Sequence, residues 1–447
     1  MADPKVAVFT GPEIKTALPG PKAKKVLAKD KQFVSPSYTR DYPFVIDRGQ
    51  DVWVWDVDDN RFLDFTAGVA VTNLGHSHPE VLKVIADQSK RFLHMAGTDF
   101  YYEVLAQLSE KLARIAPGDF PKKVFLVNSG TEAIEAALKL ARYATGRPRF
   151  ISFIGAFHGR TMGSLALTAS KAVQRQGFSP LMGEVTHVPY AYCYRCVYNL
   201  EPKSCAMACA NFIEEWIFTK VAPPSDVAAI VVEPIQGEGG YVVPPVEFLR
   251  TLRQICDRHK ILLITDEIQS GMGRTGKMFA SEHSGVIPDI VCVAKALANG
   301  FPLGAMIARA DLHTWGPGAH ANTFGGNPVA CAVALKVLEI IEKSLMKNAS
   351  TVGGYLGEKL AALAKKHDVI GEHRGIGLMQ AVEIVESKKF KKADPALRGK
   401  LIERCFEEGL LLLGCGPSSI RFIPPLTVTR AQVDVAMAIF EGALAKA

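Results

Sequence analysis

The chain has 447 residues, which is enough for two or three domains with a sizeable buried core. Apolar residues make up 48% of it and charged residues 22%, so a disordered chain, a collagen-like repeat and a pure coiled coil are excluded. The net charge of +7 is spread along the sequence without a basic block, so we expect no nucleic-acid-binding face.

The sequence contains no segment that suggests a membrane or secretory protein. No uninterrupted apolar stretch approaches the roughly 20 residues that cross a bilayer. The N-terminus, Met1 to Lys5, lacks the basic and apolar regions of a signal peptide. Nine cysteines are few for this length and odd in number, which argues against a secreted disulfide scaffold. We therefore expect a cytoplasmic protein with no membrane partner.

The first 75 residues predict an N-terminal arm and a small-domain segment. Residues 1–50 are rich in Pro and Lys and predict an irregular arm. Residues 52–55 and 62–65 predict two short strands, because Asp58, Asp59 and Asn60 between them are typical of a turn.

From about residue 76 to residue 327, short apolar runs alternate with helical patterns. The helical patterns include residues 133–143 and 247–259. The predicted strands are residues 124–128, 149–153, 228–232, 261–265, 290–294 and 305–308. Such alternation predicts an α/β fold with a largely parallel sheet and helices on both faces.

Residues 328–447 have a different pattern and predict a smaller α+β domain. Helical patterns run over residues 328–343, 355–366 and 396–408. Residues 410–413 and 420–422 have the apolar character of strands, and residues 375–383 lie between the helices.

Reactive residues follow three of the predicted strands of the large domain. Ligands bind outside the carboxyl ends of strands in open α/β sheets. Residues 124–128 are followed by Ser129, Gly130 and Thr131 and at once by a helix, which indicates either a phosphate cup or an ordinary helix cap. Asp266 follows the fourth strand and Lys295 the fifth.

These three strand ends together match the needs of one cofactor. A buried amine has a lowered pKa and can form a Schiff base, although a lone lysine after a strand usually faces solvent. A phosphate, a basic ring nitrogen and an aldehyde require a phosphate cup, a carboxylate and a lysine. Pyridoxal 5′-phosphate (PLP) carries all three groups, so the sequence predicts a PLP enzyme.

Ordered motifs along residues 51–425 resemble those of the class III (ω-amino acid) aminotransferases, which are fold-type I PLP enzymes. The resemblance implies a large domain with a mostly parallel central sheet and a smaller α+β domain. The matching segments are residues 64–68, 74–79, 129–133, 157–161, 232–240, 266–276, 295, 300–304 and 322–328.

The resemblance implies roles around the cofactor ring. Lys295 is expected to hold the cofactor covalently and to move a proton between the substrate carbon and the cofactor. Asp266 is expected to keep the ring nitrogen protonated, so that the ring accepts charge. Gln269 resembles the partner of the ring oxygen. Phe157 resembles the aromatic side chain stacked on the ring, with His158 beside it.

The resemblance also implies how the phosphate is bound and how subunits associate. Gly130 and Thr131 are expected to bind the phosphate. Thr323 resembles the residue that reaches the phosphate from a neighbouring subunit. The expectation is a homodimer with shared active sites, and a dimer of dimers is left open.

Three further residues resemble those that bind substrate in this family. Arg160 is expected to bind the carboxylate of 2-oxoglutarate or the distal carboxylate of an ω-amino acid. Arg421 is expected to bind an α-carboxylate, and Glu238 to neutralise Arg421 when the donor has no carboxylate there. A purely structural ion pair is the alternative for Glu238 and Arg421.

The amino donor is predicted to be an ω-amino acid, with 4-aminobutyrate first and 2-oxoglutarate as acceptor. Ornithine aminotransferases tend to have a tyrosine where this chain has Val69, a small apolar residue nearer the 4-aminobutyrate type. Residues 412–416 also look like those of 4-aminobutyrate aminotransferases. Residues 239–245 and 320–327 look instead like archaeal relatives. The alternatives are therefore an ornithine or acetylornithine aminotransferase, or an amino-acid racemase on the same scaffold.

Four cysteines depart from the common family pattern. Cys193, Cys196, Cys205 and Cys209 have the spacing C-x2-C-x8-C-x3-C, which suits a tetrahedral zinc site. A packed aromatic insert or a disulfide explains the same residues, so we expect no metal among the site residues.

Overall fold

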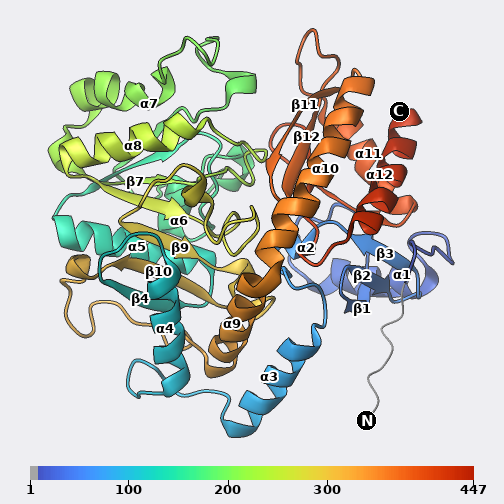
Figure 1. The fold of residues 1–447 in the computed structure, drawn as a ribbon, viewed down its shortest axis with the longest axis horizontal. Helices are drawn as coiled ribbons and strands as arrows, with labels where there is room; N and C mark the ends of the chain where they lie inside the picture. Colours follow the sequence, from blue (N-terminus) through green and yellow to red (C-terminus); the bar gives the residue numbers. More distant parts are fainter. Residues whose placement is uncertain (1–8, 447) are drawn as a thin grey trace.

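The computed structural model describes residues 9–446, with a seven-stranded sheet in its larger half (Figure 1). In spatial order this sheet consists of β4 (Lys122–Val127), β10 (Gly304–Arg309), β9 (Ile290–Val293), β8 (Leu262–Asp266), β7 (Val227–Val232), β5 (Arg149–Phe153) and β6 (Val185–Val188).

The sheet is mostly parallel, as predicted. β6, β5, β7, β8 and β9 pair in parallel, whereas β10 is antiparallel to both β9 and β4. The carboxyl ends of β4, β5, β7, β8 and β9 therefore meet at one edge. β6 was not predicted, because this edge strand is mostly half-exposed and lacks an apolar run.

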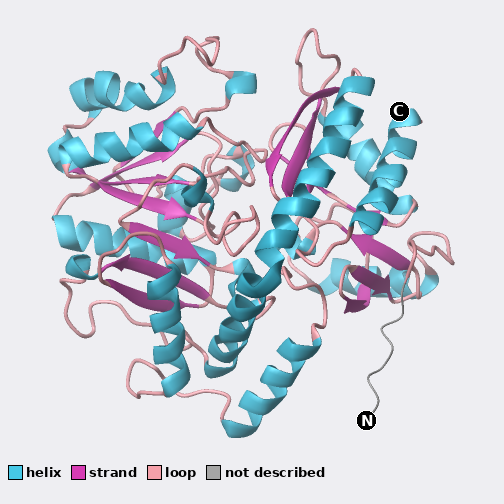
Figure 2. Cartoon of the chain, in the orientation of Figure 1, coloured by secondary structure: helices cyan, strands magenta, loops and turns pink. Residues whose placement is uncertain are grey.

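Helices cover both faces of this sheet (Figure 2). In β7, Ile230 and Val232 pack in one apolar cluster with residues of α8, while Ala229 and Val231 pack in another with residues of α5. Burial on both faces explains why β7 is apolar at every position. The helices of this half are α3 (Pro79–Arg91), α4 (Glu103–Ile115), α5 (Gly130–Thr145), α6 (Met162–Leu167), α7 (Ala208–Phe212) and α8 (Val246–His259).

Two four-stranded sheets make up the rest. One has the order β1 (Ile46–Gln50), β2 (Trp53–Asp56), β3 (Arg61–Asp64) and β13 (Leu410–Leu411); the other has β11 (Ile370–Ile376), β12 (Met379–Ile384), β15 (Ser419–Phe422) and β14 (Leu413–Cys415). The predicted strand 410–413 thus divides between two sheets. Its first part pairs with β3, so that a strand from the N-terminal part of the chain and one from the C-terminal part lie in the same sheet. The remaining helices are α1 (Pro21–Phe33), α2 (Ala67–Ala70), α9 (Pro328–Ile340), α10 (Met346–Lys366), α11 (Pro395–Glu407) and α12 (Arg430–Ala445).

The prediction of an irregular arm over residues 1–50 is wrong where α1 and β1 form; residues 1–8 lie outside the described part of the chain. α1 buries only Ala23, and β1 is almost wholly exposed. Neither element therefore carries the apolar periodicity by which a helix or strand is recognised.

The predicted helices 328–343 and 355–366 belong to one helical column. α9 continues through a wider turn at Ile341–Leu345 into α10 (Figure 1). Gly353 and Gly354 weaken the helical pattern, but Gly353 has a packing reason. A Cβ atom at Gly353 would lie 2.2 Å from the backbone carbon of Gly377, in the turn between β11 and β12.

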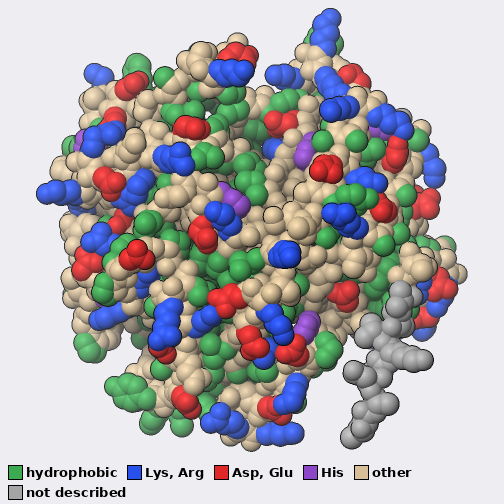
Figure 3. Space-filling view, in the orientation of Figure 1, with side chains coloured by type: hydrophobic (Ala, Val, Ile, Leu, Met, Phe, Trp, Pro, Cys, Tyr) green, Lys and Arg blue, Asp and Glu red, His purple; other side chains and the backbone are tan. Residues whose placement is uncertain are grey.

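No helix within residues 9–446 is long and apolar enough to cross a membrane. On the face that Figure 3 shows, Lys and Arg side chains are interspersed with Asp and Glu. This distribution agrees with the dispersed charge of the sequence.

Substitutions of the two neighbouring glycines in α10 should have opposite effects. Gly353→Ala should lower the free energy of unfolding by roughly 1–3 kcal/mol, because the new methyl group overlaps backbone. Gly354→Ala is the matched control: a Cβ there meets nothing within 4 Å, and the gain in helix propensity should stabilise by about 0.5–1 kcal/mol. Melting temperatures of the two variants measure the difference, and equal values would contradict the packing argument.

Candidate active site

A cavity of about 430 Å³ lies at the carboxyl edge of the large sheet. Segments that follow β4, β5, β8 and β9 contribute to its walls, as strand order and direction require. Eight of the predicted site residues line it: Gly130, Thr131, Phe157, His158, Arg160, Asp266, Gln269 and Lys295.

Asp266 ends β8 and is only 4% exposed. Its Oδ2 lies 2.8 Å from Nδ1 of His158, and its Oδ1 accepts a hydrogen bond from the backbone N–H of Ile268 at 3.0 Å. Burial opposes a charge on His158, but the hydrogen bond and charge of Asp266 outweigh it and raise the pKa of the ring. His158 therefore supplies positive charge and a fixed orientation to the Asp266 carboxylate.

Lys295 lies at the same edge because β8 and β9 are parallel. Asp266 pairs with Cys292, three residues before Lys295, in the register of the two strands. Burial lowers the pKa of the Lys295 amine to about 8, although Asp266 acts in the opposite direction. A substantial share of neutral amine near pH 8 makes this lysine a competent nucleophile.

Glu233 is a buried site residue that we did not single out from the sequence. It follows β7 and accepts hydrogen bonds from the backbone N–H groups of Phe157 and Gly237, both at 3.0 Å. Burial raises the pKa of Glu233 to about 7; His158 opposes this shift and Asp266 adds to it. Its position directly after a buried strand is the same signal that identified Asp266.

The other end of the cavity has the chemistry of an anion site. Thr131 is in the first turn of α5, where backbone N–H groups favour an anion. Its hydroxyl lies 2.6 Å from that of Ser164 and 2.7 Å from that of Thr161. Gly159 approaches so closely that a Cβ there would lie 2.3 Å from the Thr131 hydroxyl oxygen, and its φ of +139° also favours glycine.

The residues present fit PLP. Oε1 of Gln269 and Nε2 of His158 are buried without a hydrogen-bond partner in the structure. Gly237 leaves room for Gln269, since a Cβ at Gly237 would lie 2.5 Å from Nε2 of that amide. These residues match the groups of this cofactor: the anion site suits its phosphate, the buried lysine its aldehyde, and Asp266 its ring nitrogen. Gln269 adds a polar group without a partner in the structure.

The predicted pair of Glu238 and Arg421 is present beside this cavity. Oε2 of Glu238 lies 3.4 Å from Nη1 of Arg421, and both charges influence the pKa of Lys295. Sequence analysis missed Lys171, whose Nζ lies only 2.6 Å from Oε1 of Glu238. A single lysine in a loop carries no distinguishing pattern, so only the folded chain identifies it.

Val69 and Thr323 do not line the cavity. Val69 belongs to α2, whose four residues all have positive φ angles, and Val71 lines the cavity in its place. A β-branched residue is strained in this left-handed conformation. Thr323 is exposed, away from the cavity lining of its own chain. Arg160 lines the cavity with its guanidinium 5.4 Å from the Phe157 ring centre.

A network of buried polar side chains holds the turn that follows Glu238. Arg374, in β11, donates two hydrogen bonds to the carbonyl of Gly240, at 2.7 and 3.0 Å. Arg374 also pairs with Glu383 of β12 at 2.7 Å. Tyr192 and Arg195, from the cysteine-containing insert, contact the same Glu383. The insert of the larger half thus supports the sheet that carries Arg421.

The four clustered cysteines are free thiols that line one small cavity of about 20 Å³. Burial raises the pKa of Cys209 to about 11. Within residues 9–446, no three His, Cys, Asp or Glu side chains are arranged to hold a metal ion.

The chain is similar to characterised enzymes over nearly its whole length. The family model "Aminotransferase class-III" matches residues 34–444. Sequence identity is 40% to the 4-aminobutyrate aminotransferase GabT of Escherichia coli (92% of this chain, 95% of the relative) and 39% to the 5-aminovalerate aminotransferase DavT of Pseudomonas aeruginosa (94% and 97%). Sequence identity to an alanine/serine racemase of Pyrococcus horikoshii is 36%, over 98% of this chain and 94% of the relative.

Solved structures agree with this match. A PLP-bound amine transaminase from an uncultivated Pseudomonas species superimposes with a TM-score of 0.86 at 32% identity, over 93% of this chain and 98% of that one. The predicted fold class and cofactor are thereby confirmed. The chain belongs to the class III aminotransferases and is a PLP-dependent transaminase.

Proposed function

We propose that this aminotransferase moves the amino group of an ω-amino acid, 4-aminobutyrate first among them, to 2-oxoglutarate. The observation that carries the proposal is the contact of Glu238 with the buried Arg421 beside a cavity that also contains Arg160. Two arginines, one of them covered by a carboxylate, suit two substrates that differ by one carboxylate. The products are the semialdehyde of the donor and glutamate.

Bound PLP supplies an electron sink for the charge that develops at the donor carbon. Asp266, oriented by His158, would keep the ring nitrogen protonated. Gln269 would donate a hydrogen bond to the ring oxygen, and Phe157 would pack against the ring. Lys295 would hold the cofactor through its aldehyde, and its amine, once released, would carry the proton that leaves the donor carbon.

Substrate binding divides between the two arginines. Arg160 binds the distal carboxylate of either substrate through its paired N–H groups. Glu238 neutralises Arg421 while 4-aminobutyrate occupies the site. When glutamate or 2-oxoglutarate enters, Glu238 moves away and Arg421 binds the α-carboxylate. Val71, rather than the predicted Val69, supplies an apolar wall near the donor.

We further propose a cytoplasmic homodimer. Gly130 and Thr131 bind the phosphate in their own chain, and Thr323 of the partner subunit completes the site. This assignment is supported by the exposure of Thr323 away from its own cavity. Nine free thiols suit a reducing compartment.

The alternative reading is an ornithine-type aminotransferase or a racemase. The 36% identity to an alanine/serine racemase favours testing the latter, because racemisation needs the same lysine and cofactor. A panel of amino donors with 2-oxoglutarate, beside chiral analysis of each donor without a keto acid, separates the three activities. If an apolar amino acid is racemised faster than any donor is transaminated, the proposed function is wrong and the protein is a racemase.

Lys295→Ala should abolish turnover, by more than about a thousandfold, because both the covalent link and the proton carrier are removed. The fold should persist, since neither role is needed for packing. Steady-state rates, with the melting temperature as control, test this. Turnover within tenfold of wild type would contradict the assignment of Lys295.

Capture of PLP by the apoenzyme should follow the ionisation of Lys295. The neutral amine attacks the aldehyde, so the capture rate should rise with pH around a midpoint near 8, rather than near the ordinary lysine value of 10.5. The absorbance that develops after mixing measures this rate, with Lys295→Ala as control. A midpoint above 10 would show that the amine is not desolvated as described.

Glu238→Gln should impair the half-reaction with 4-aminobutyrate far more than that with glutamate. A buried guanidinium left without its partner costs about 3–5 kcal/mol and attracts any carboxylate within reach. Arg160→Ala is the comparison and should impair both half-reactions. Single-turnover absorbance with each donor separates the two patterns. Equal losses in Glu238→Gln would mean that the pair is structural.

A further inference from the structure

Glu238 contacts two cations, and the nearer one is not Arg421. Its Oε1 lies 2.6 Å from Nζ of Lys171, whereas its Oε2 lies 3.4 Å from Arg421. Each carboxylate oxygen therefore has its own cationic partner. Lys171 belongs to the larger half of the molecule and follows α6, while Arg421 lies in β15 of the small sheet.

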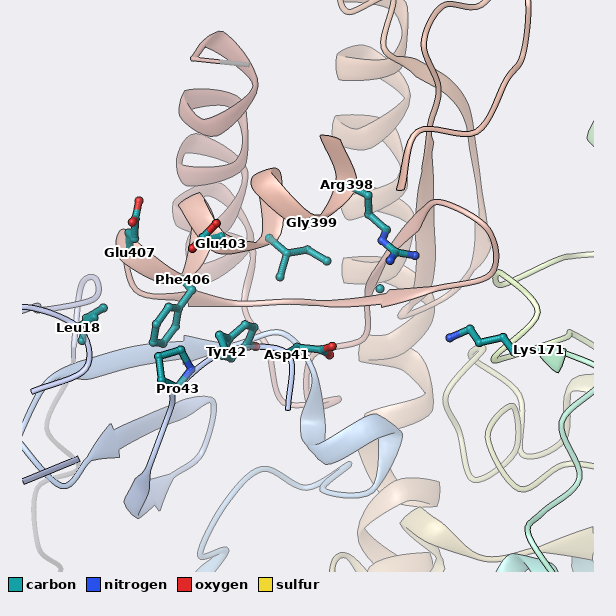
Figure 4. Close-up of a pocket in the computed structure, with 12 residues that line it drawn as sticks. Leu18, Asp41, Tyr42, Pro43, Lys171, Arg398, Gly399, Glu403, Phe406 and Glu407 are labelled. Carbon is teal, nitrogen blue, oxygen red and sulfur yellow. The ribbon is translucent and has the colours of Figure 1, made fainter. Parts of the chain in front are cut away.

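The two cations have different surroundings. The Arg421 side chain is 7% exposed, and its Nε has no hydrogen-bond partner in the structure. The Lys171 side chain is 40% exposed and extends into a second cavity, of about 410 Å³, toward Asp41 and Arg398 (Figure 4). Lys171 thus has room to follow a moving carboxylate, whereas Arg421 is confined by its packing.

Movement of Glu238 away from Arg421 has an electrostatic cost. The Glu238 side chain is 18% exposed, so water replaces a lost partner only in part. A half-buried carboxylate without a cation is unfavourable. Because Lys171 already contacts the other oxygen, Glu238 can leave Arg421 and still keep a charge-assisted hydrogen bond.

We infer that Lys171 is a positioning residue that retains Glu238 when Arg421 is released to a substrate carboxylate. This inference rests on the proposed function and deepens it. Lys171 lowers the cost of the open arrangement, which the glutamate and 2-oxoglutarate half-reaction requires. In the closed arrangement Arg421 also neutralises Glu238, so the loss of Lys171 matters less there than in the open arrangement.

The test compares Lys171→Gln with wild type in single-turnover half-reactions of the PLP-loaded enzyme. The rate constant over apparent dissociation constant for glutamate should fall roughly tenfold, mainly through weaker binding, whereas that for 4-aminobutyrate should change less than about threefold. Lys171→Arg should restore this ratio for glutamate to within about threefold of the wild-type value. Lys83→Gln, which removes a 76% exposed lysine on α3, is the matched control for charge and should change neither.

A double variant distinguishes action through Glu238 from a general effect of the loop. In a Glu238→Gln background, Lys171→Gln should have no further effect on glutamate, because the carboxylate that it retains is absent. An additive loss, or an equal loss with both donors, would overturn the inference. If wild type does not convert 4-aminobutyrate, the proposed donor is wrong. The glutamate measurements still decide the role of Lys171, and an unchanged glutamate reaction in Lys171→Gln would refute it.

Discussion

The active site depends on the burial of one carboxylate, that of Asp266, at the end of a strand with almost no access to water. A charge in that position needs partners, and the chain supplies His158 from the segment after β5 and a backbone N–H from Ile268. The same buried edge lowers the pKa of Lys295 and raises that of Glu233. Burial at one edge therefore accounts for the reactivity of the lysine and for the rigid orientation of the groups around it.

The second half of the site depends on contacts between the two parts of the molecule. Arg421 and Arg374 come from the small sheet, while Glu238 and Gly240 lie in one loop of the larger half. Arg374 binds a backbone carbonyl and fixes the base of this loop. The Glu238 side chain has cations on both sides of it. A fixed loop with one movable carboxylate is suited to accepting two substrates in turn without rebuilding the pocket.

Most of the large sheet could be predicted from the sequence because its strands are buried on both faces and read as continuous apolar runs. Two of the elements that escaped prediction are exposed: α1 buries a single alanine, and β6 is an edge strand. Glu233 could have been found by the reasoning that identified Asp266, since both follow a buried strand. Lys171 could not, because its significance lies in a distance across 67 residues of sequence.

The sequence by itself determined the family, the cofactor and the residues at the ends of the strands, since alternating elements and strand-end chemistry are local patterns. Only the tertiary structure decided that Lys171 is a second cationic partner of Glu238. Glu238, Lys171 and Arg421 come from three distant segments, and their separations depend on how the small sheet packs against the large one. Ion pairs act over a few ångströms and leave no periodic trace along the chain. The family resemblance predicted the pair of Glu238 and Arg421, but only the folded molecule reveals that Lys171 shares Glu238.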